Sequence, residues 1–312
     1  MLRSLVGSEM CIRDRYYWSH GNEKFERRSS KNDAFTTGFV QAGNITVGTF
    51  KEELLKTARS TLDHYPNLNP CVFFSGGVDS EAILRAYIEI GSNPTVYIIR
   101  YEKDYNIYDV SYAISICNSL GISYNLVDFN LEKFYENDAV EISNMAQIDR
   151  PRMLPHLKFT ECADGLIIVG HSDMYWYRTD GDYSKKGTWL VKDFEHDIGC
   201  DKYTLLKNRS AIYQWWKWNP GIMLSYINMS WFQKLISDQF PRRQGTNSTK
   251  INGFKEAYPD MITRQKQTGF EKIDSLIEEV ENCLISRNGG LIYRGEVIRS
   301  LDELISDIGI KL

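Results

Sequence analysis

The sequence predicts an α/β fold in which helices flank a parallel sheet, followed by a mostly helical C-terminal part. Three observations lead to this prediction. Between residues 49 and 200, short continuous apolar runs alternate with amphipathic segments of helical length, which is typical of parallel strands buried on both faces. The glycine-containing run Ser75-Gly76-Gly77-Val78-Asp79-Ser80 joins one apolar run to the next amphipathic segment. From about Asp201 the pattern becomes helical and aromatic.

The first elements follow from local signals. Thr49, with Glu52 three residues later, predicts a capping box at the start of a helix. The apolar run Cys71–Phe74 predicts a buried strand. The segment from Ser80 to Ile90 predicts a helix, and Gly91 suits the position just past its end.

Three further strands complete the expected sheet. They are Thr95–Ile99, Ile122–Val127 and Leu166–Val169, and a helix over Asp109–Leu120 connects the first two. Because ligands of open parallel sheets bind beyond the carboxyl ends of the strands, we expect the site near the glycine run, Arg100–Tyr101 and Gly170.

The C-terminal part reads as a helix near Glu271–Ile285, a hairpin around Arg294-Gly295, and a helix capped by Ser300 with Glu303. The aromatic group Trp215–Trp218 fits core packing better than a ligand site.

Composition narrows the class of protein. The chain has 312 residues and a net charge of −4, which argues against general nucleic-acid binding. No apolar run reaches the length of a membrane span. The six cysteines are scattered without a CxxC pair, as in a reduced cytoplasmic protein without a structural zinc or iron–sulfur site. We therefore expect a cytoplasmic location and no membrane contact.

The glycine run has the chemistry of a phosphate site. Glycines let the backbone approach an anion closely, and the first turn of a helix offers unpaired N–H groups at its positive dipole end. Ser75 and Ser80 add hydroxyl donors, and Asp79 offers an oxygen ligand for Mg²⁺. No lysine follows the glycines, so the run is not a GxxxxGK[ST] loop.

The run SGGVDS resembles the pyrophosphate (PP) loop of the N-type ATP pyrophosphatases. The wider pattern, with TVYIIRYEKDYNIYDVSYA after it, is similar to the synthetase domain of asparagine synthetase and β-lactam synthetase. This resemblance implies a Rossmann-like fold of the adenine nucleotide alpha hydrolase type. It also implies that ATP is cut between its α and β phosphates, and that Ser75, Gly76, Gly77, Val78, Asp79 and Ser80 hold ATP.

A second motif strengthens the resemblance. Arg264-Gln265-Lys266-Gln267-Thr268-Gly269-Phe270 is similar to the family's R-x-K segment, which follows a proline-containing helix end. The resemblance implies catalytic roles for Lys266 and Arg264, with Lys266 stabilising charge on the phosphates. Without the family, the same residues would read equally well as a solvated basic turn.

The remaining site residues also come from the resemblance. Arg100 and Tyr101 would lie where the family contacts adenine, and Gly170 would line the nucleotide site. Asp173 would join Asp79 in holding Mg²⁺, although asparagine synthetase has an Asp-Glu pair where this chain has Asp173-Met174. His171 stays open between a phosphate donor, a substrate contact and a structural loop histidine.

The domain organisation follows from these motifs. Residues 1–15 resemble translated sequencing-adapter read-through of the kind found in environmental assemblies, and we leave them out of the fold prediction. We expect an N-terminal segment over 16–48, a PP-loop ATP-binding domain over 49–200, and a helical region over 201–312 that completes the active site. No glutaminase domain is recognisable; either ammonia or another amine is used directly, or that domain was lost at the adapter junction or is supplied by a separate partner.

The resulting expectation is an AMP-forming ligase that uses ATP and Mg²⁺ to activate a small-molecule carboxylate for attack by ammonia or an amine. Two alternatives stay open. One is a nucleobase- or tRNA-modifying enzyme with the same loop, related to 7-deazaguanine synthases, and the other is a nucleotide-binding module without catalysis.

Overall fold

The computed structural model describes residues 10–13, 16–20, 35–39, 46–170, 176–178, 189–230, 232–233, 246–262, 264, 266–287, 296–300, 303–304 and 306. The hairpin expected around Arg294-Gly295 lies outside these residues. Within them, no helix combines the length and the apolar character needed to cross a bilayer.

Five strands of the described chain form one parallel sheet in the order β10-β7-β4-β5-β6. The strands are β4 (Pro70–Phe73), β5 (Thr95–Tyr101), β6 (Tyr124–Phe129), β7 (Leu166–Val169) and β10 (Ala211–Ile212). The chain runs outward from β4 to β6, then returns to the other side of β4 with β7. The order in which strands are added to the sheet therefore reverses between β4 and β7. Open parallel sheets bind ligands at such a reversal of strand order.

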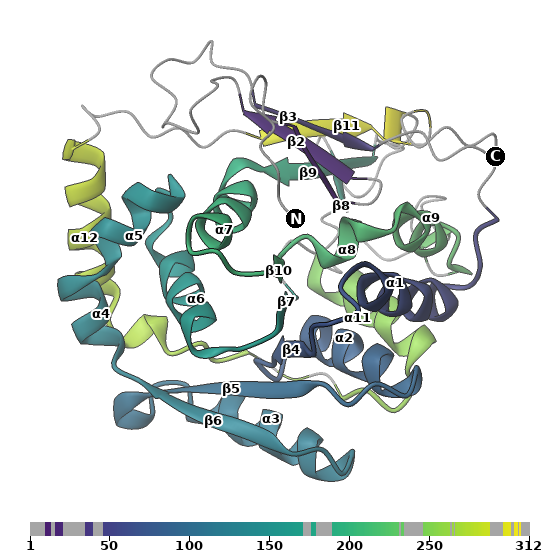
Figure 1. Cartoon of the computed structure of the whole chain (residues 1–312), viewed down its shortest axis with the longest axis horizontal. Helices are drawn as coiled ribbons and strands as arrows, with labels where there is room; N and C mark the ends of the chain where they lie inside the picture. Colours follow the sequence, from purple (N-terminus) through teal and green to yellow (C-terminus); the bar gives the residue numbers. More distant parts are fainter. Residues whose placement is uncertain are drawn as a thin grey trace.

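Helices cover both faces of this sheet, which confirms the predicted α/β class (Figure 1). One face shares a hydrophobic core with residues of α1 (Phe50–His64), α2 (Val78–Glu89), α3 (Ile107–Ser119), α8 (Trp215–Trp218), α9 (Pro220–Ile227) and α11 (Thr246–Ala257). The other shares a second core with residues of α4 (Leu131–Asn137), α5 (Ala139–Ala146), α6 (Leu154–Phe159), α7 (Glu195–Leu206) and α12 (Asp274–Arg287). Strand residues alternate between the two cores, because successive side chains of a strand point to opposite faces.

Short 3-10 turns connect several of these elements: η1 (Glu102–Asp104), η2 (Pro151–Met153), η3 (Thr160–Cys162) and η4 (Phe270–Lys272). The C-terminal helix begins at Asp274, after η4, and not near Glu271 as expected. Gly269, with φ of 82°, turns the chain just before η4. The predicted cap at Ser300 is confirmed, because its hydroxyl and backbone N–H exchange hydrogen bonds with Glu303.

Two antiparallel sheets were not predicted from the sequence. One contains β1 (Met10–Arg13), β2 (Tyr16–His20) and β3 (Phe35–Phe39), and the other contains β8 (Trp176–Arg178), β9 (Trp189–Phe194) and β11 (Glu296–Ser300). β11 pairs with β9, more than a hundred positions earlier in the chain. A local pattern does not reveal such a distant pairing.

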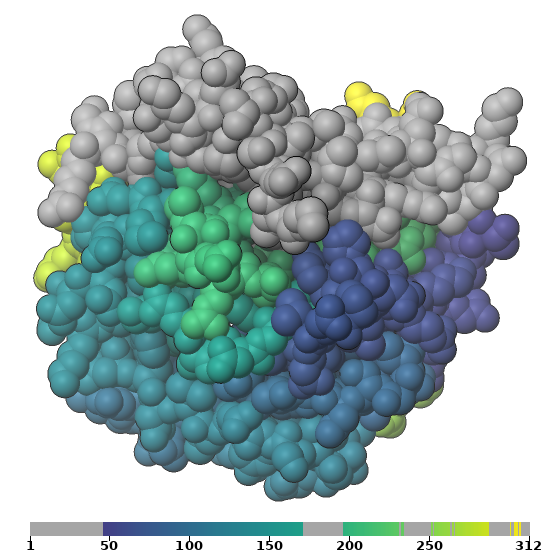
Figure 2. Space-filling model, viewed as in Figure 1, coloured from purple at the N-terminus to yellow at the C-terminus, as the bar shows by residue number. Residues whose placement is uncertain are grey.

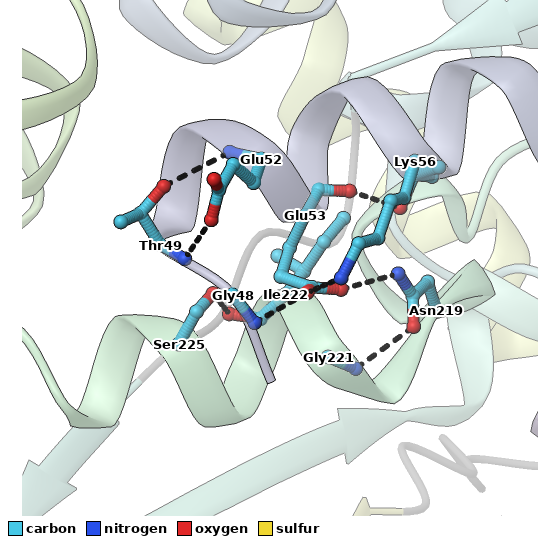
Figure 3. A network of polar contacts seen from close by, with 10 residues as sticks. Gly48, Thr49, Glu52, Glu53, Lys56, Asn219, Gly221, Ile222 and Ser225 are labelled. Carbon is cyan, nitrogen blue, oxygen red and sulfur yellow. Dashed lines mark hydrogen bonds and ion pairs between the residues drawn. The ribbon is translucent and has the colours of Figure 1, made fainter. Parts of the chain in front are cut away.

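A buried carboxylate ties the start of α1 to α9. The predicted capping box of Thr49 and Glu52 is present, and the next residue, Glu53, is only 1 % exposed. Its carboxylate accepts hydrogen bonds from the Gly48 N–H at 2.7 Å and the Asn219 amide at 2.9 Å (Figure 3). Asn219 in turn caps α9 by accepting from the Gly221 N–H. In the space-filling view, the surface of α1 abuts that of the 195–230 stretch (Figure 2). The C-terminal region therefore packs directly on the helix that precedes β4.

Candidate active site

The glycine run forms the turn between β4 and α2, at the carboxyl edge of the sheet. Gly76 has φ of 70°, a left-handed conformation that favours glycine. A Cβ on Gly76 would stand 2.9 Å from the Asp109 carbonyl oxygen and 3.0 Å from the Arg264 guanidinium. The turn therefore depends on glycine both for its backbone conformation and for close packing against α3.

The first turn of α2 is suited to an anion. Gly77 is its N-cap residue, and no described side chain caps it. The Ser80 hydroxyl donates to the Gly77 carbonyl at 3.1 Å and lies 3.4 Å from the Ser75 hydroxyl. Uncapped N–H groups, the positive end of the helix dipole and two hydroxyls thus face the same place.

A cavity of about 380 Å³ lies beside this turn. Among the residues predicted from the sequence, its lining includes Ser75, Asp79, Ser80, Tyr101, Gly170 and Lys266. The rest is largely aromatic and apolar, with Phe73, Phe74, Tyr97, Ile98, Ile99, Val110, Met153, Phe159, Val169, Cys200, Tyr213 and Phe270, together with Asn106, Asp109, His156 and Thr268. This volume and this lining are typical of small-molecule sites, in which a few polar groups orient a ligand among apolar walls.

Gly170 allows β7 to end close to α2. A Cβ on Gly170 would stand 3.3 Å from the backbone nitrogen of Ser80 and 3.1 Å from the Ile83 side chain. The ends of β4 and β7 thus meet at the first turn of α2, where the order of the strands reverses. His171 and Asp173 follow Gly170 in sequence and lie outside the described residues.

A distant segment lies over the glycine turn. We call it the strap and define it as Ile262, Arg264 and Lys266–Phe270, which follow α11. The Arg264 guanidinium donates to the Gly76 carbonyl at 3.3 Å and to the Asp109 carboxylate at 2.6 Å. It also lies 4.4 Å from the centre of the Tyr112 ring, within the range of a cation–π contact.

The strap brings Lys266 to the glycine turn. The Lys266 ammonium lies 3.9 Å from the point where a Cβ on Gly77 would stand. A compact cation is thereby placed beside the helix N-terminus, and a fixed charge in a partly dry cavity acts more strongly than one in water. The two motifs recognised in the sequence are neighbours in space.

Tyr101 and Arg100 have different surroundings, although they are adjacent in β5. Tyr101 is buried and lines the cavity, with its ring close to Phe159 and Phe270. Burial, helped by the negative charge of Asp109, raises the pKa of its hydroxyl, which therefore stays a neutral donor. Arg100 is absent from the lining of the described cavity and instead forms an ion pair with Asp128 at 2.6 Å.

Asp79 is the described carboxylate best placed for a metal. It is the second residue of α2 and lines the cavity. Burial, together with the negative charge of Asp79, raises the pKa of the Tyr226 hydroxyl on α9. Among the described residues, no group of three His, Cys, Asp or Glu side chains is arranged to hold a metal ion. The Asp79 carboxylate on the cavity wall fits Mg²⁺, which usually takes one or two protein carboxylates and completes its shell with water and phosphate oxygens.

Asn106, Asp109 and His156 line the cavity and were not singled out from the sequence. Asn106 holds the end of β5 by accepting from the Tyr101 N–H at 2.8 Å and donating to the Ile99 carbonyl at 2.9 Å. Asp109 receives the strap. Its signal in the sequence is a carboxylate next to Val110 on the apolar face of a predicted helix, where a charged group needs a partner.

No protein-family model and no curated protein matches the chain. Among solved structures, it is similar to NMN synthetase from Francisella tularensis, with a TM-score of 0.31 and 11% identity over 69% of this chain and 96% of that one. It is also similar to NH3-dependent NAD synthetase from Campylobacter jejuni subsp. jejuni NCTC 11168, with a TM-score of 0.31 and 13% identity over 78% of this chain and 96% of that one. At this distance the likeness assigns no activity to the chain.

Proposed function

We propose that this protein is an ATP-dependent ligase that forms AMP and pyrophosphate while activating a carboxylate. One observation carries the proposal. The cavity lies where the strand order reverses between β4 and β7, and it gathers Ser75, Asp79, Ser80 and Lys266 around the first turn of α2. Hydroxyls, helix N–H groups and a lysine suit a pyrophosphate group, and the aromatic remainder of the cavity suits a flat base and an organic acid.

The chemistry has two steps. A carboxylate oxygen of the acid attacks the α-phosphorus of ATP, and the bond from that phosphorus to the oxygen bridging to the β-phosphate breaks. Pyrophosphate leaves with the electron pair, and an acyl-adenylate remains. The nitrogen of ammonia or an amine then attacks the acyl carbon, the acyl carbon–oxygen bond breaks, AMP leaves, and a proton from the nitrogen passes to solvent.

The residues of the loop and the strap would divide this work. The Ser75 and Ser80 hydroxyls and the N–H groups of α2 would hold the pyrophosphate oxygens. Lys266 would stabilise the negative charge that builds up on the phosphates as the bond breaks, and such a preorganised charge is worth roughly 10²–10³ in rate. Asp79, with Asp173 as a second candidate, would hold Mg²⁺, which neutralises phosphate charge when it is bound.

The test is product formation by the full-length chain. It is incubated with MgATP, ammonium and a panel of carboxylic acids, and AMP, ADP, pyrophosphate and phosphate are separated by chromatography. We expect equal amounts of AMP and pyrophosphate that depend on one class of acid. ADP with phosphate as the products would contradict the proposal.

Variants then assign the residues. Lys266→Ala should lower AMP formation by roughly 10²–10³. Asp79→Ala should lower AMP formation and raise the Mg²⁺ concentration at which it is half-maximal. Lys272→Ala is the matched control, because Lys272 is exposed in η4 and lies outside the cavity lining. Full AMP formation by both Lys266→Ala and Asp79→Ala would overturn the proposed roles.

A further inference from the structure

Asp109 is a buried carboxylate near the start of α3 that none of the motif resemblances assigns. Its side chain is 7 % exposed, and it borders the cavity. Placing a charged group there costs free energy unless partners are built around it. Its partners come from the strap, more than 150 positions further along the chain.

One oxygen of Asp109 holds the strap on both sides of Lys266. Oδ1 accepts from the Arg264 guanidinium at 2.6 Å and from the backbone N–H of Gln267 at 2.9 Å. Arg264 and Gln267 precede and follow Lys266 in sequence. The carboxylate therefore fixes both ends of the short stretch that carries the lysine.

The same contacts tie the strap to the glycine turn. Arg264, held by Asp109, also donates to the Gly76 carbonyl at 3.3 Å and covers the Tyr112 ring. The Tyr112 hydroxyl donates to the Ile262 carbonyl at 2.8 Å, at the upstream end of the strap. α3, the strap and the turn thus form one network with Asp109 at its centre.

Charge gives the network a second consequence. Asp109 balances the positive charge of Arg264. The positive charge of Lys266 is therefore the net charge that this part of the strap places beside the glycine turn. We propose that Asp109 is the positioning residue that sets the Lys266 ammonium beside the glycine turn for pyrophosphate binding. This inference rests on the proposed function, and Asp109 acts through Lys266 without contacting the phosphates.

The test is a double-mutant cycle on binding of magnesium pyrophosphate, measured by isothermal titration calorimetry on the full-length chain. The proteins are wild type, Asp109→Ala, Lys266→Ala and the double variant. Asp109→Ala should weaken binding roughly tenfold in the wild-type background and leave it unchanged in the Lys266→Ala background, because a residue that acts through another couples to it. A residue needed only for folding would weaken binding equally in both backgrounds.

Two further variants sharpen the cycle. Asp109→Asn keeps an oxygen that can accept both bonds but loses the charge, so its affinity should fall between wild type and Asp109→Ala. It also serves if Asp109→Ala fails to fold. Asp128→Ala is the matched control, because it breaks an Arg–Asp pair of the same 2.6 Å length outside the cavity lining, and it should bind like wild type.

The outcomes separate the two levels of the proposal. If wild type does not bind magnesium pyrophosphate, the proposed function fails and the role of Asp109 falls with it. If wild type binds but the losses from Asp109→Ala and Lys266→Ala add, the positioning role alone is overturned. Weakened binding by Asp109→Ala that disappears without Lys266, with Asp109→Asn intermediate, is the expected result.

Discussion

Two Arg–Asp pairs in this protein have the same length but opposite surroundings. Arg264–Asp109 and Arg100–Asp128 each bring a guanidinium nitrogen within 2.6 Å of a carboxylate oxygen. In the first pair the side chains are 20 % and 7 % exposed, and in the second 37 % and 57 %. Because water and salt screen exposed charges, equal distances do not mean equal energies.

The two pairs also arise differently from the chain. Arg100 and Asp128 are register partners on the neighbouring strands β5 and β6, so the pairing of the sheet alone brings them together. Arg264 and Asp109 belong to no common sheet, and their pair connects the strap to α3. The exposed pair follows from the fold, whereas the buried pair joins two segments that build the cavity.

The largest expected difference is in stability. Arg264→Ala leaves the buried Asp109 carboxylate without its guanidinium, and breaking such a pair should lower the free energy of unfolding by about 3 kcal/mol. Urea unfolding followed by tryptophan fluorescence measures the change. Arg100→Ala is the matched variant, and its effect should be far smaller, because both members of the Arg100–Asp128 pair are solvated. Equal losses from the two variants would mean that burial does not separate the pairs.

A smaller effect is expected where the buried pair meets the glycine turn. Gly76→Ala places a methyl group 3.0 Å from the Arg264 guanidinium and keeps φ at 70°; strain and crowding should together cost about 2 kcal/mol. Gly91→Ala is the control, since Gly91 has φ of 80° but nothing within 4 Å of its added Cβ. It should cost about 1 kcal/mol from strain alone.

Ligand binding separates these two glycine variants more clearly than stability does. Gly76→Ala should abolish binding of magnesium pyrophosphate in calorimetry, because the methyl group displaces either the turn or Arg264. Gly91→Ala should bind like wild type, since it lies at the far end of α2. If Gly76→Ala keeps wild-type affinity, the turn does not carry the phosphate site.

The contrast between the pairs also explains what the sequence could predict. Four strands of the parallel sheet and the helices α1, α2 and α3 were recognisable because each is a local pattern of apolar residues, and the bounds differ from the prediction by only a few positions: β4 ends at Phe73 and α2 begins at Val78. The fifth strand, β10, has only two residues and was not predicted. The pairing of β9 with β11 was not recognisable, because it joins residues more than a hundred positions apart. Local periodicity carries no information about such partners.

For the candidate site, the sequence located the two motifs but not the group that joins them. Resemblance placed Lys266 near the glycine turn, and the geometry has them adjacent. Asp109 looked like the ordinary acidic start of a helix, since a carboxylate in the first turn suits the helix dipole. Its place beside Val110 on the apolar face indicates that it needs a partner, but only the packed structure shows that Arg264 and Gln267 are the partners.

The smallest expected effect is the pH dependence of the exposed pair. The hydrogen bond from Arg100 lowers the pKa of Asp128 below its ordinary value of 3.8. A carboxyl group whose pKa is lowered on folding stabilises the protein above the ordinary value and loses that contribution as the pH falls through the lowered one. The melting temperatures of wild type and Asp128→Asn should therefore differ slightly at pH 7 and converge in acid below pH 3.8. Because the pair is solvated, added salt should remove the difference at pH 7 as well. A difference that survives both acid and salt would show that Asp128 contributes through packing, and that the two pairs are more alike than their exposure indicates.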